Sequence, residues 1–333
     1  MTPAQQLRRD IETCELPHLM FEEHLTALKQ RIDDALAGFA PKVFRVPGPS
    51  RVGKSSLIAK LSRDYPETRN AGRRNVPVLV VRVPHSTTVK LLPKSVLRAL
   101  GFRVRGNMTE GELFTLMVEQ LDLAGTRVVI FDEISHLVDE GSRVPPRAAS
   151  DWLKTLVDPN PEEQRLGVTL ILFGIPRLER LFSANDQLRK RACPARNFLP
   201  YDASDAAQMT AYDSCVTAYA RMFAAAGYPI DVRPRVLTQQ SYLLTGGLIG
   251  VLANFMCELA ILMAREAPRA ISYADCQKAL ECVSHAGSPH KLAFEDSGVE
   301  DAGVEPAALK QAYVHVLASS SASVPIRKKS GVK

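Results

Sequence analysis

The pattern of apolar positions divides the chain into a first part with short apolar runs and a later part with helical periodicity. Val76–Val83, Val128–Phe131 and Val168–Gly174 are nearly continuous apolar runs, as in strands buried on both faces of a parallel sheet. A shorter run, Val43–Val46, precedes a loop bounded by glycines. Because segments with helical spacing separate these runs, the pattern predicts an α/β fold with a parallel sheet.

Apolar residues at helical spacing predict one helix before the sheet and several more along the chain. Leu25, Leu28, Ile32 and Leu36 recur within Phe21–Phe39, which we expect to pack beside the sheet domain. Further helices are expected from the glycine-bounded loop to Arg63 and at residues 89–100, 109–123, 177–182, 204–226, 234–244, 248–265, 272–285 and 305–319. We also expect a charged loop at residues 67–75, a last edge strand at 197–200 and a disordered basic tail at 319–333.

The loop after the first apolar run fits the phosphate-binding pattern G-x-x-x-x-G-K-[ST] at every constrained position. Glycines let such a backbone turn so that successive N–H groups point at phosphate oxygens, and the following helix adds the positive end of its dipole. Lys54 can bring a cation to the β- and γ-phosphates, and the Ser55 hydroxyl can bind Mg²⁺. We expect the nucleotide to contact Gly48, Pro49, Ser50, Arg51, Val52, Gly53, Lys54, Ser55 and Ser56.

Two carboxylates, Asp132 and Glu133, directly follow the apolar run Val128–Phe131. Ligands of open α/β sheets bind at the carboxyl ends of the strands, which is where these acids would lie. Beside a phosphate loop, Asp132 is expected to bind Mg²⁺ and Glu133 to orient and polarise the attacking water. A strand that simply ends in surface acids is the alternative.

Length and composition describe an ordinary chain with enough residues for one large or two medium domains. The 333 residues are 46% hydrophobic and 23% charged, and they begin without an apolar signal segment. No apolar run reaches the roughly 18 residues that suggest a membrane span. Six cysteines and seven histidines show no metal-binding spacing, so we expect a reduced, cytoplasmic protein. The net charge of +6 permits an acidic partner such as nucleic acid without requiring one.

The order of these parts resembles that of AAA+ ATPases, and most of all the TniB/TnsC family of transposition regulators, which includes CRISPR-associated members. The segments that carry the resemblance are Gly48–Ser56, Val81–His85, Ile130–Glu133, Leu172–Leu181 and Thr245–Gly250. The resemblance implies a P-loop αβα sandwich followed by an all-helical lid. It divides the chain into an N-terminal helical extension (1–40), the AAA+ nucleotide-binding domain (41–202), the lid (203–285) and a C-terminal helix with a flexible basic tail (286–333).

The resemblance also implies a function in DNA transposition. Proteins of this family bind ATP and Mg²⁺, assemble as rings or filaments on double-stranded DNA of any sequence, and connect a TniQ-type target-selection protein to a DDE transposase. The nucleotide is then expected between subunits, where an arginine of the neighbouring subunit completes the site. Arg189 and Arg191 are our candidates for that arginine, although a basic surface loop or a DNA contact would explain them as well.

Two departures from the family pattern predict slow ATP hydrolysis. Ile175 follows the last apolar strand, where a polar sensor residue is usual, and Val251 follows the lid glycines, where related proteins often carry arginine. Both residues remove polar groups from the neighbourhood of the γ-phosphate. We therefore expect nucleotide binding and assembly, more than ATP hydrolysis, to be the main activity of the protein.

Five cations are candidates for DNA contact. Lys90, Lys94 and Arg98 are spaced to share one face of the expected helix at 89–100, and Arg103 and Arg105 follow in a loop. In the resembled family this region faces the pore, where cations give salt-sensitive binding without sequence preference. A solvated basic helix face is the alternative.

Two other functions remain open from the sequence. One is a signalling-type ATPase switch that acts on a protein partner, and the other is a replication-initiator or helicase-loader ATPase. No obvious winged-helix segment for reading DNA follows the predicted lid, which argues against an initiator.

Overall fold

The structure of the chain is a computed structural model that describes residues 2–14, 16, 18–70, 72–85, 88, 90–104, 107–139, 144–158, 167–283, 293–294 and 303–321. It consists of two compact units. The sheet unit is formed by Leu25–Gly48 and Leu57–Phe198. The helical unit is formed by Met1–His24, Pro49–Ser56 and Leu199–Ala318.

Four parallel strands in the order β1-β6-β5-β4 form the centre of the sheet unit. Their bounds are β1 Val43–Pro47, β4 Val78–Arg82, β5 Val128–Asp132 and β6 Thr169–Gly174. The parallel α/β sheet that the apolar runs predict is confirmed. Successive side chains of a strand point to opposite faces, and in β5 both sets are buried: Val129 and Phe131 belong to one core cluster, whereas Val128 and Ile130 lie outside it.

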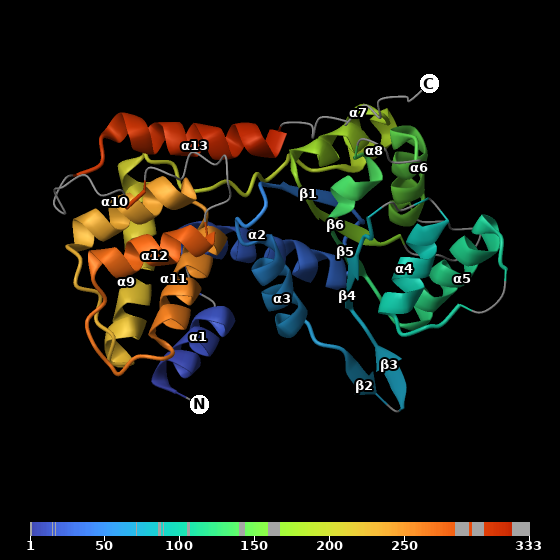
Figure 1. The fold of residues 1–333 in the computed structure, drawn as a ribbon. Coiled ribbons are helices and arrows are strands. Elements are labelled where there is room, and N and C mark those ends of the chain that lie inside the picture. Colours follow the sequence, from blue (N-terminus) through green and yellow to red (C-terminus); the bar gives the residue numbers. More distant parts are fainter. Residues whose placement is uncertain are drawn as a thin grey trace, which may run out of the picture. The chain divides into compact units, whose positions relative to one another are not determined.

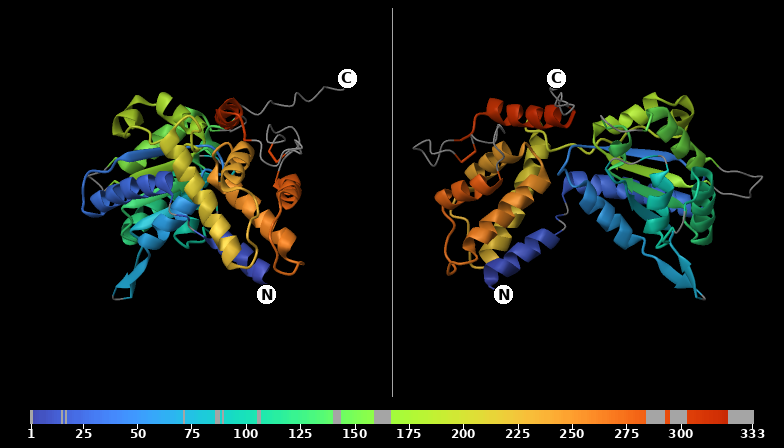
Figure 2. Two further views of the ribbon diagram at one scale, coloured as in Figure 1. Left: turned by 90° about the vertical axis from the view of Figure 1, so that its left-hand side faces the viewer. Right: turned by 45° about the vertical axis from the view of Figure 1, so that its right-hand side comes forward.

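Helices cover both faces of the sheet (Figures 1 and 2). α4 (Leu91–Ala99), α5 (Glu110–Leu123) and α6 (Pro146–Val157) pack on the face that carries Phe131. Trp152 of α6, the only tryptophan in the sequence, is 6% exposed and contacts the Phe131 ring edge-on. α2 (Leu19–Leu36) from Leu25 onward and α3 (Lys54–Asp64) from Leu57 onward lie on the other face, joined by an ion pair of 2.6 Å between Lys29 and Asp64.

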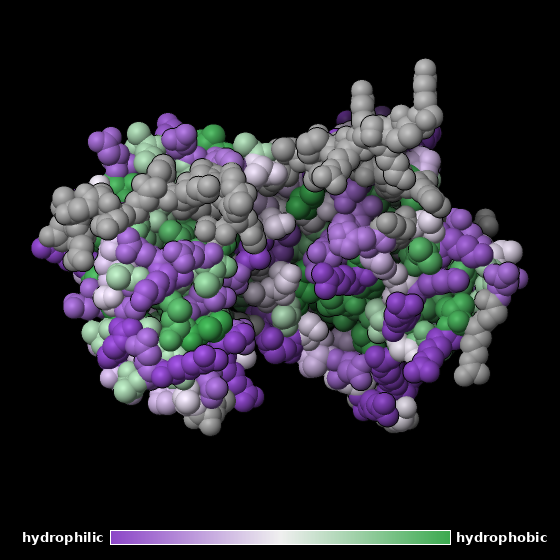
Figure 3. Space-filling view, viewed as in Figure 1, coloured by the Kyte–Doolittle hydropathy of each residue, from purple (hydrophilic) through white to green (hydrophobic). Residues whose placement is uncertain are grey.

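The sheet unit differs from the predicted elements in several places. Residues 67–75, expected as a loop, contain the antiparallel strands β2 (Thr68–Asn70) and β3 (Arg73–Asn75). These strands are polar along their whole length, so they carry no apolar alternation, and Figure 3 shows hydrophilic residues over them. The short helix expected at 177–182 is present, as one turn of 3₁₀ helix, η2 (Pro176–Glu179), that continues directly into α7 (Arg180–Ser183). Finally, α6 and α8 (Asp186–Arg191) are helices that the sequence analysis does not include.

The segment after α8 runs along the free edge of β1. The prediction of a strand at 197–200 is wrong, but backbone hydrogen bonds of 2.8–2.9 Å do join this segment to β1. Their donors are the N–H groups of Cys193, Arg196 and Phe198, and their acceptors are the carbonyls of Val43, Arg45 and Pro47. Because the donors are spaced by three and then by two residues, a regular ladder does not form.

The helical unit consists of the predicted helices and one more. α9 (Ala206–Ala225), α10 (Pro234–Thr245), α11 (Ile249–Met263), α12 (Tyr273–Val283) and α13 (Pro306–Ser321) agree with expectation. α1 (Pro3–Thr13) buries Ala4, Leu7 and Ile11 in the same core, so the prediction of a single helix in the first 40 residues is wrong. Its start carries a capping box between Thr2 and Gln5, a signal that the sequence does contain. α13 extends into the tail predicted to be disordered, of which residues 322–333 lie outside the described residues.

Within the described part of the chain, no single helix has both the length and the apolar composition needed to cross a membrane. α10 and α11 meet those criteria only when they are combined, and they are bent by 115° relative to each other. Leu252, Phe255 and Leu259 of α11 are fully buried in the core of the helical unit.

The buried carboxylate of Asp275 stabilises the turn before α12. Asp275 is 5% exposed and accepts hydrogen bonds of 2.7–3.0 Å from the Arg269 guanidinium and from the amide and hydroxyl of Ser272. These interactions, the Arg269 hydrogen bond first, hold the pKa of Asp275 well below its ordinary value of 3.8, although burial opposes them. We expect Asp275→Asn to lower the free energy of unfolding by roughly 2 kcal/mol at neutral pH, measured by urea denaturation.

The lowered pKa of Asp275 also determines how its contribution to the free energy of unfolding depends on pH. Because the folded state favours the ionised carboxylate, its stabilisation is present above the ordinary pKa of 3.8 and is lost as the pH falls below it. Glu266→Gln is the matched control, since Glu266 contacts the same arginine with a side chain that is 44% exposed. Equal destabilisation by the two variants would contradict the assignment.

Candidate functional site

The glycine-bounded loop connects β1 to α3 and has the backbone of an anion-binding turn. Arg51 and Gly53 have left-handed φ values of 64° and 115°, and α3 begins at Lys54. The Lys54 ammonium donates to the Pro49 carbonyl across the loop at 2.6 Å. A loop of this kind, followed directly by a helix N-terminus, presents backbone N–H groups to a phosphate. The residues therefore fit a nucleotide phosphate.

Gly48 is required by close packing and not by a special backbone angle. Its N–H donates to the Gly174 carbonyl at the end of β6, at 3.0 Å. A Cβ atom built on Gly48 would lie 2.3 Å from the Phe198 carbonyl oxygen, a contact that no side chain allows. The start of the loop is thus clamped between β6 and the segment that follows α8.

The acidic end of β5 lies between two neighbouring strands. Asp132 is the last residue of β5 and pairs in register with Arg82 of β4. Glu133 follows with a φ of 58° and leads into the 3₁₀ turn η1 (Ile134–Leu137). A left-handed backbone is rare for a residue other than glycine, and it directs the Glu133 side chain away from the line of the strand.

Arg82 is a partner of Glu133 that the sequence analysis missed. Its Nε donates to the Glu133 carboxylate at 3.0 Å. Burial raises the pKa of Glu133, but the hydrogen bond and charge of Arg82, helped by His136 and His85, bring the net value below the ordinary one. The contact depends on the register of β4 against β5, which apolar runs leave open by several residues.

A hydroxyl from a neighbouring turn lies beside the end of β6, although the residue that follows this strand, Ile175, is apolar. Ser135 of η1 is 4% exposed, and its hydroxyl lies 3.4 Å from the Ile175 amide and beside Gly174. The Ser135 hydroxyl is thus directed at the backbone where β6 ends. Sequence reasoning could not place it, because Ser135 is separated from Ile175 by the whole of α6.

The glycine-rich lid segment contacts the phosphate loop inside the helical unit. The Gly250 N–H donates to the Arg51 carbonyl at 2.9 Å, and a Cβ on Gly250 would lie 2.5 Å from that oxygen. Gly247 has a φ of 85° and leaves no room for a Cβ beside the Tyr201 backbone. Gly250 therefore brings the start of α11 directly against the phosphate loop, and Gly247 lets the preceding turn approach the Tyr201 backbone.

The arginine-finger candidates and the candidates for DNA contact that the structure describes lie in the sheet unit. Arg189 and Arg191 are in the last turn of α8, where they pair with Asp186 at 2.8 Å and Asp158 at 3.0 Å. Lys94 and Arg98 are on α4, away from its buried residues, whereas Lys90 directly precedes the helix. Arg103 is exposed in the following loop, and Arg105 lies outside the described residues.

A family model described as bacterial TniB protein matches residues 20–198, more than half of the chain. The chain belongs to the TniB family. The match includes the phosphate loop, the acidic end of β5 and the arginines of α8, so all these parts come from the region that defines the family. The expected family of AAA+ ATPases is confirmed. A comparison with curated proteins gives no match.

Several solved structures share the fold of this chain. The ORC2 protein of Aeropyrum pernix, in ADPNP–ADP complexes, matches with a TM-score of 0.61 and 14% identity over 84% of this chain and 72% of its own. Cdc6p of Pyrobaculum aerophilum matches with a TM-score of 0.59 and 15% identity over 81% and 68%. The Aeropyrum pernix ORC1 protein in complex with DNA matches with a TM-score of 0.52 and 17% identity over 83% and 69%. At these identities the similarity establishes the AAA+ fold of this TniB-family protein.

The contact between Gly250 and Arg51 predicts that a single methyl group disturbs the phosphate loop. Gly250→Ala must push the Arg51 carbonyl away or shift α11, at a cost of about 1–3 kcal/mol. We expect the affinity for a fluorescent ATP analogue to fall by about tenfold or more. Gly111→Ala is the control, because the same methyl group meets nothing within 4 Å on α5. Unchanged nucleotide affinity in a folded Gly250→Ala protein would contradict this prediction.

Proposed function

We propose that this TniB-family protein is an ATP-dependent regulator of DNA transposition. It binds ATP with Mg²⁺, assembles on double-stranded DNA, and links a TniQ-type target-selection protein to a DDE transposase. The observation that carries the proposal is the family match over residues 20–198, which includes an intact phosphate loop and a carboxylate-ended β5. A cytoplasmic location follows from this role.

The proposed chemistry assigns each polar group at the site a role. The loop amides and Lys54 hold the phosphates, Ser55 and Asp132 bind Mg²⁺, and Glu133 polarises the attacking water. The sheet order supports this assignment, because β1 and β5 both flank β6, so Gly48 and Asp132 lie at the same edge. The Aeropyrum pernix ORC2 protein, whose structure is of ADPNP–ADP complexes, adds support from a protein of the same fold.

We propose that ATP hydrolysis is slow and that the assembled, ATP-bound form is the one that acts in transposition. Neither Ile175 nor Val251 offers a polar side chain to the γ-phosphate, and Arg82 holds the Glu133 carboxylate in an ion pair. A carboxylate paired in this way is a weaker acceptor for a water proton. The ATP-bound form should therefore last long enough to assemble.

The proposed assembly uses two groups of cations. Arg189 or Arg191 of one subunit would reach the γ-phosphate bound by the next, which makes assembly depend on nucleotide. Both side chains are more than half exposed, at 62% and 51%, so a neighbouring subunit can reach them. Lys90, Lys94, Arg98, Arg103 and Arg105 would contact the DNA backbone.

Assembly tests the proposal directly. We expect light scattering of the purified protein to show a large complex only when duplex DNA and ATP or a non-hydrolysable analogue are both present. Lys54→Ala should abolish the complex because the ammonium is needed at the phosphates, whereas Lys310→Ala, an exposed lysine on α13, should leave it intact. A protein that binds ATP but ignores DNA at low salt would overturn the proposal in favour of a switch that acts on a protein partner.

The ion pair between Arg82 and Glu133 gives a kinetic prediction. We expect Arg82→Ala to free the carboxylate and to raise the rate of ATP hydrolysis by about threefold or more, which corresponds to about 0.7 kcal/mol. Arg221→Ala, an exposed arginine on α9, is the control for loss of a positive charge. A lower rate in Arg82→Ala would mean that the arginine positions Glu133 for catalysis, contrary to the proposed restraint.

A further inference from the structure

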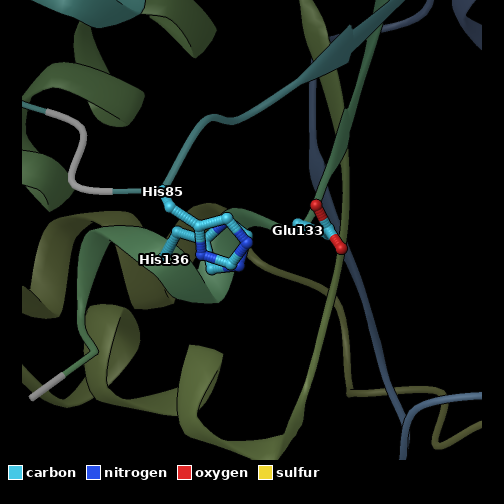
Figure 4. Close-up of side chains that lie close together, drawn as sticks. All are labelled: His85, Glu133 and His136. Carbon is cyan, nitrogen blue, oxygen red and sulfur yellow. The ribbon is translucent and has the colours of Figure 1, made fainter.

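Two histidines meet the Glu133 carboxylate at the carboxyl edge of β4 and β5. His85 follows β4 and His136 belongs to η1, and both lie in the sheet unit with Glu133. One ligand atom from each of the three residues lies within 4.8 Å of the other two. In Figure 4 the two imidazole rings overlap, one in front of the other, and the Glu133 carboxylate lies to one side of them; the ring centroids are 3.8 Å apart.

The His136 ring is held in the tautomer that a metal ligand requires. Its Nδ1 lies 3.0 Å from the Val83 carbonyl oxygen. Since a carbonyl oxygen can only accept, Nδ1 must carry the hydrogen, and a neutral ring then has its lone pair on Nε2. Metal-binding histidines are oriented in this way, by a hydrogen bond from the second ring nitrogen to a carbonyl or carboxylate.

The ligand set selects one class of ion. Two imidazole nitrogens and one carboxylate oxygen suit Zn²⁺ and similar transition-metal ions, whereas Mg²⁺ prefers oxygen ligands. Three protein ligands leave a fourth position for water. Zinc at about 2.0–2.1 Å from each ligand atom draws tetrahedral ligands to about 3.4 Å of one another. His85 is exposed and lies beyond the end of β4, so rotation of its side chain can close the remaining gap.

Arg82 competes for the same carboxylate. Its Nε occupies one side of Glu133, but the arginine side chain is 74% exposed and can move into solvent at little cost. A divalent cation that also has two imidazole ligands is the stronger partner. Metal and arginine are therefore alternative partners of one carboxylate.

We propose that His85, Glu133 and His136 form a binding site for Zn²⁺ or a similar transition-metal ion. Occupation of the site takes the Glu133 carboxylate away from water and so suppresses ATP hydrolysis. This second consequence depends on the role given to Glu133 in the proposed function, whereas metal binding itself does not.

Cobalt is the probe for the site, because tetrahedral Co²⁺ absorbs visible light and reports its ligands. Titration of the full-length protein without nucleotide should give visible absorption that saturates at one Co²⁺ per chain and is displaced by Zn²⁺. We expect His136→Ala and His85→Ala to weaken binding by at least about tenfold. Arg82→Ala should strengthen it, and His315→Ala, an exposed histidine on α13, should leave it unchanged.

The outcomes distinguish binding at this site from binding by cysteines, and they test the metal site separately from the proposed function. Equal Co²⁺ binding by wild type and His136→Ala, or a spectrum dominated by thiolate-to-cobalt charge transfer, would overturn the site. In the second measurement, the ratio of ATPase rates with and without buffered Zn²⁺ should be lower in wild type than in His85→Ala or His136→Ala. An equal ratio in all three proteins would overturn the inhibitory role. A protein that binds Co²⁺ as expected but never hydrolyses ATP would support the metal site and contradict the ATPase assignment alone.

Discussion

Backbone pairing of β1 on both of its edges is the constraint on which the sheet unit depends. β6 pairs with one edge in parallel, and the N–H groups of Cys193, Arg196 and Phe198 reach the carbonyls of the other. Arg45, in the middle of β1, donates to the Cys193 carbonyl and pairs with Glu179, and its guanidinium stacks on the Phe182 ring. The strand that leads into the phosphate loop is therefore fixed on both sides before the loop begins.

Two glycines position the phosphate loop because they have no side chain. Gly48 and Gly250 occur where another carbonyl oxygen occupies the place of a Cβ, so each permits a backbone contact that no other residue allows. Gly48 sets the start of the phosphate loop against β6, and Gly250 brings α11 to the middle of the same loop. Glycines of this kind define the site by close approach, whereas Gly53 serves through its positive φ.

Three side chains, from β4, the segment after it and the turn η1, meet at the Glu133 carboxylate. Its left-handed backbone turns it toward Arg82, His85 and His136, and the three groups offer it a hydrogen bond, a positive charge and metal-binding nitrogens. One carboxylate cannot serve water, arginine and a metal ion together. If Glu133 has the role proposed for it in ATP hydrolysis, the rate of hydrolysis depends on which partner occupies its carboxylate.

The sequence alone determined the phosphate loop, the acidic end of β5, the parallel sheet and most helices. Glycine spacing, apolar runs and helical periodicity predict these features because they are properties of residues that are close together in the chain. The polar hairpin β2–β3 and the irregular edge at Cys193–Phe198 carry no such pattern, whereas α6, although not predicted, does carry an amphipathic one. Only the tertiary structure decided that Arg82 and the two histidines meet Glu133, and that Ser135 lies beside Ile175. Those contacts depend on strand register and on turns that bring distant residues together, and a sequence pattern does not fix either to within one residue.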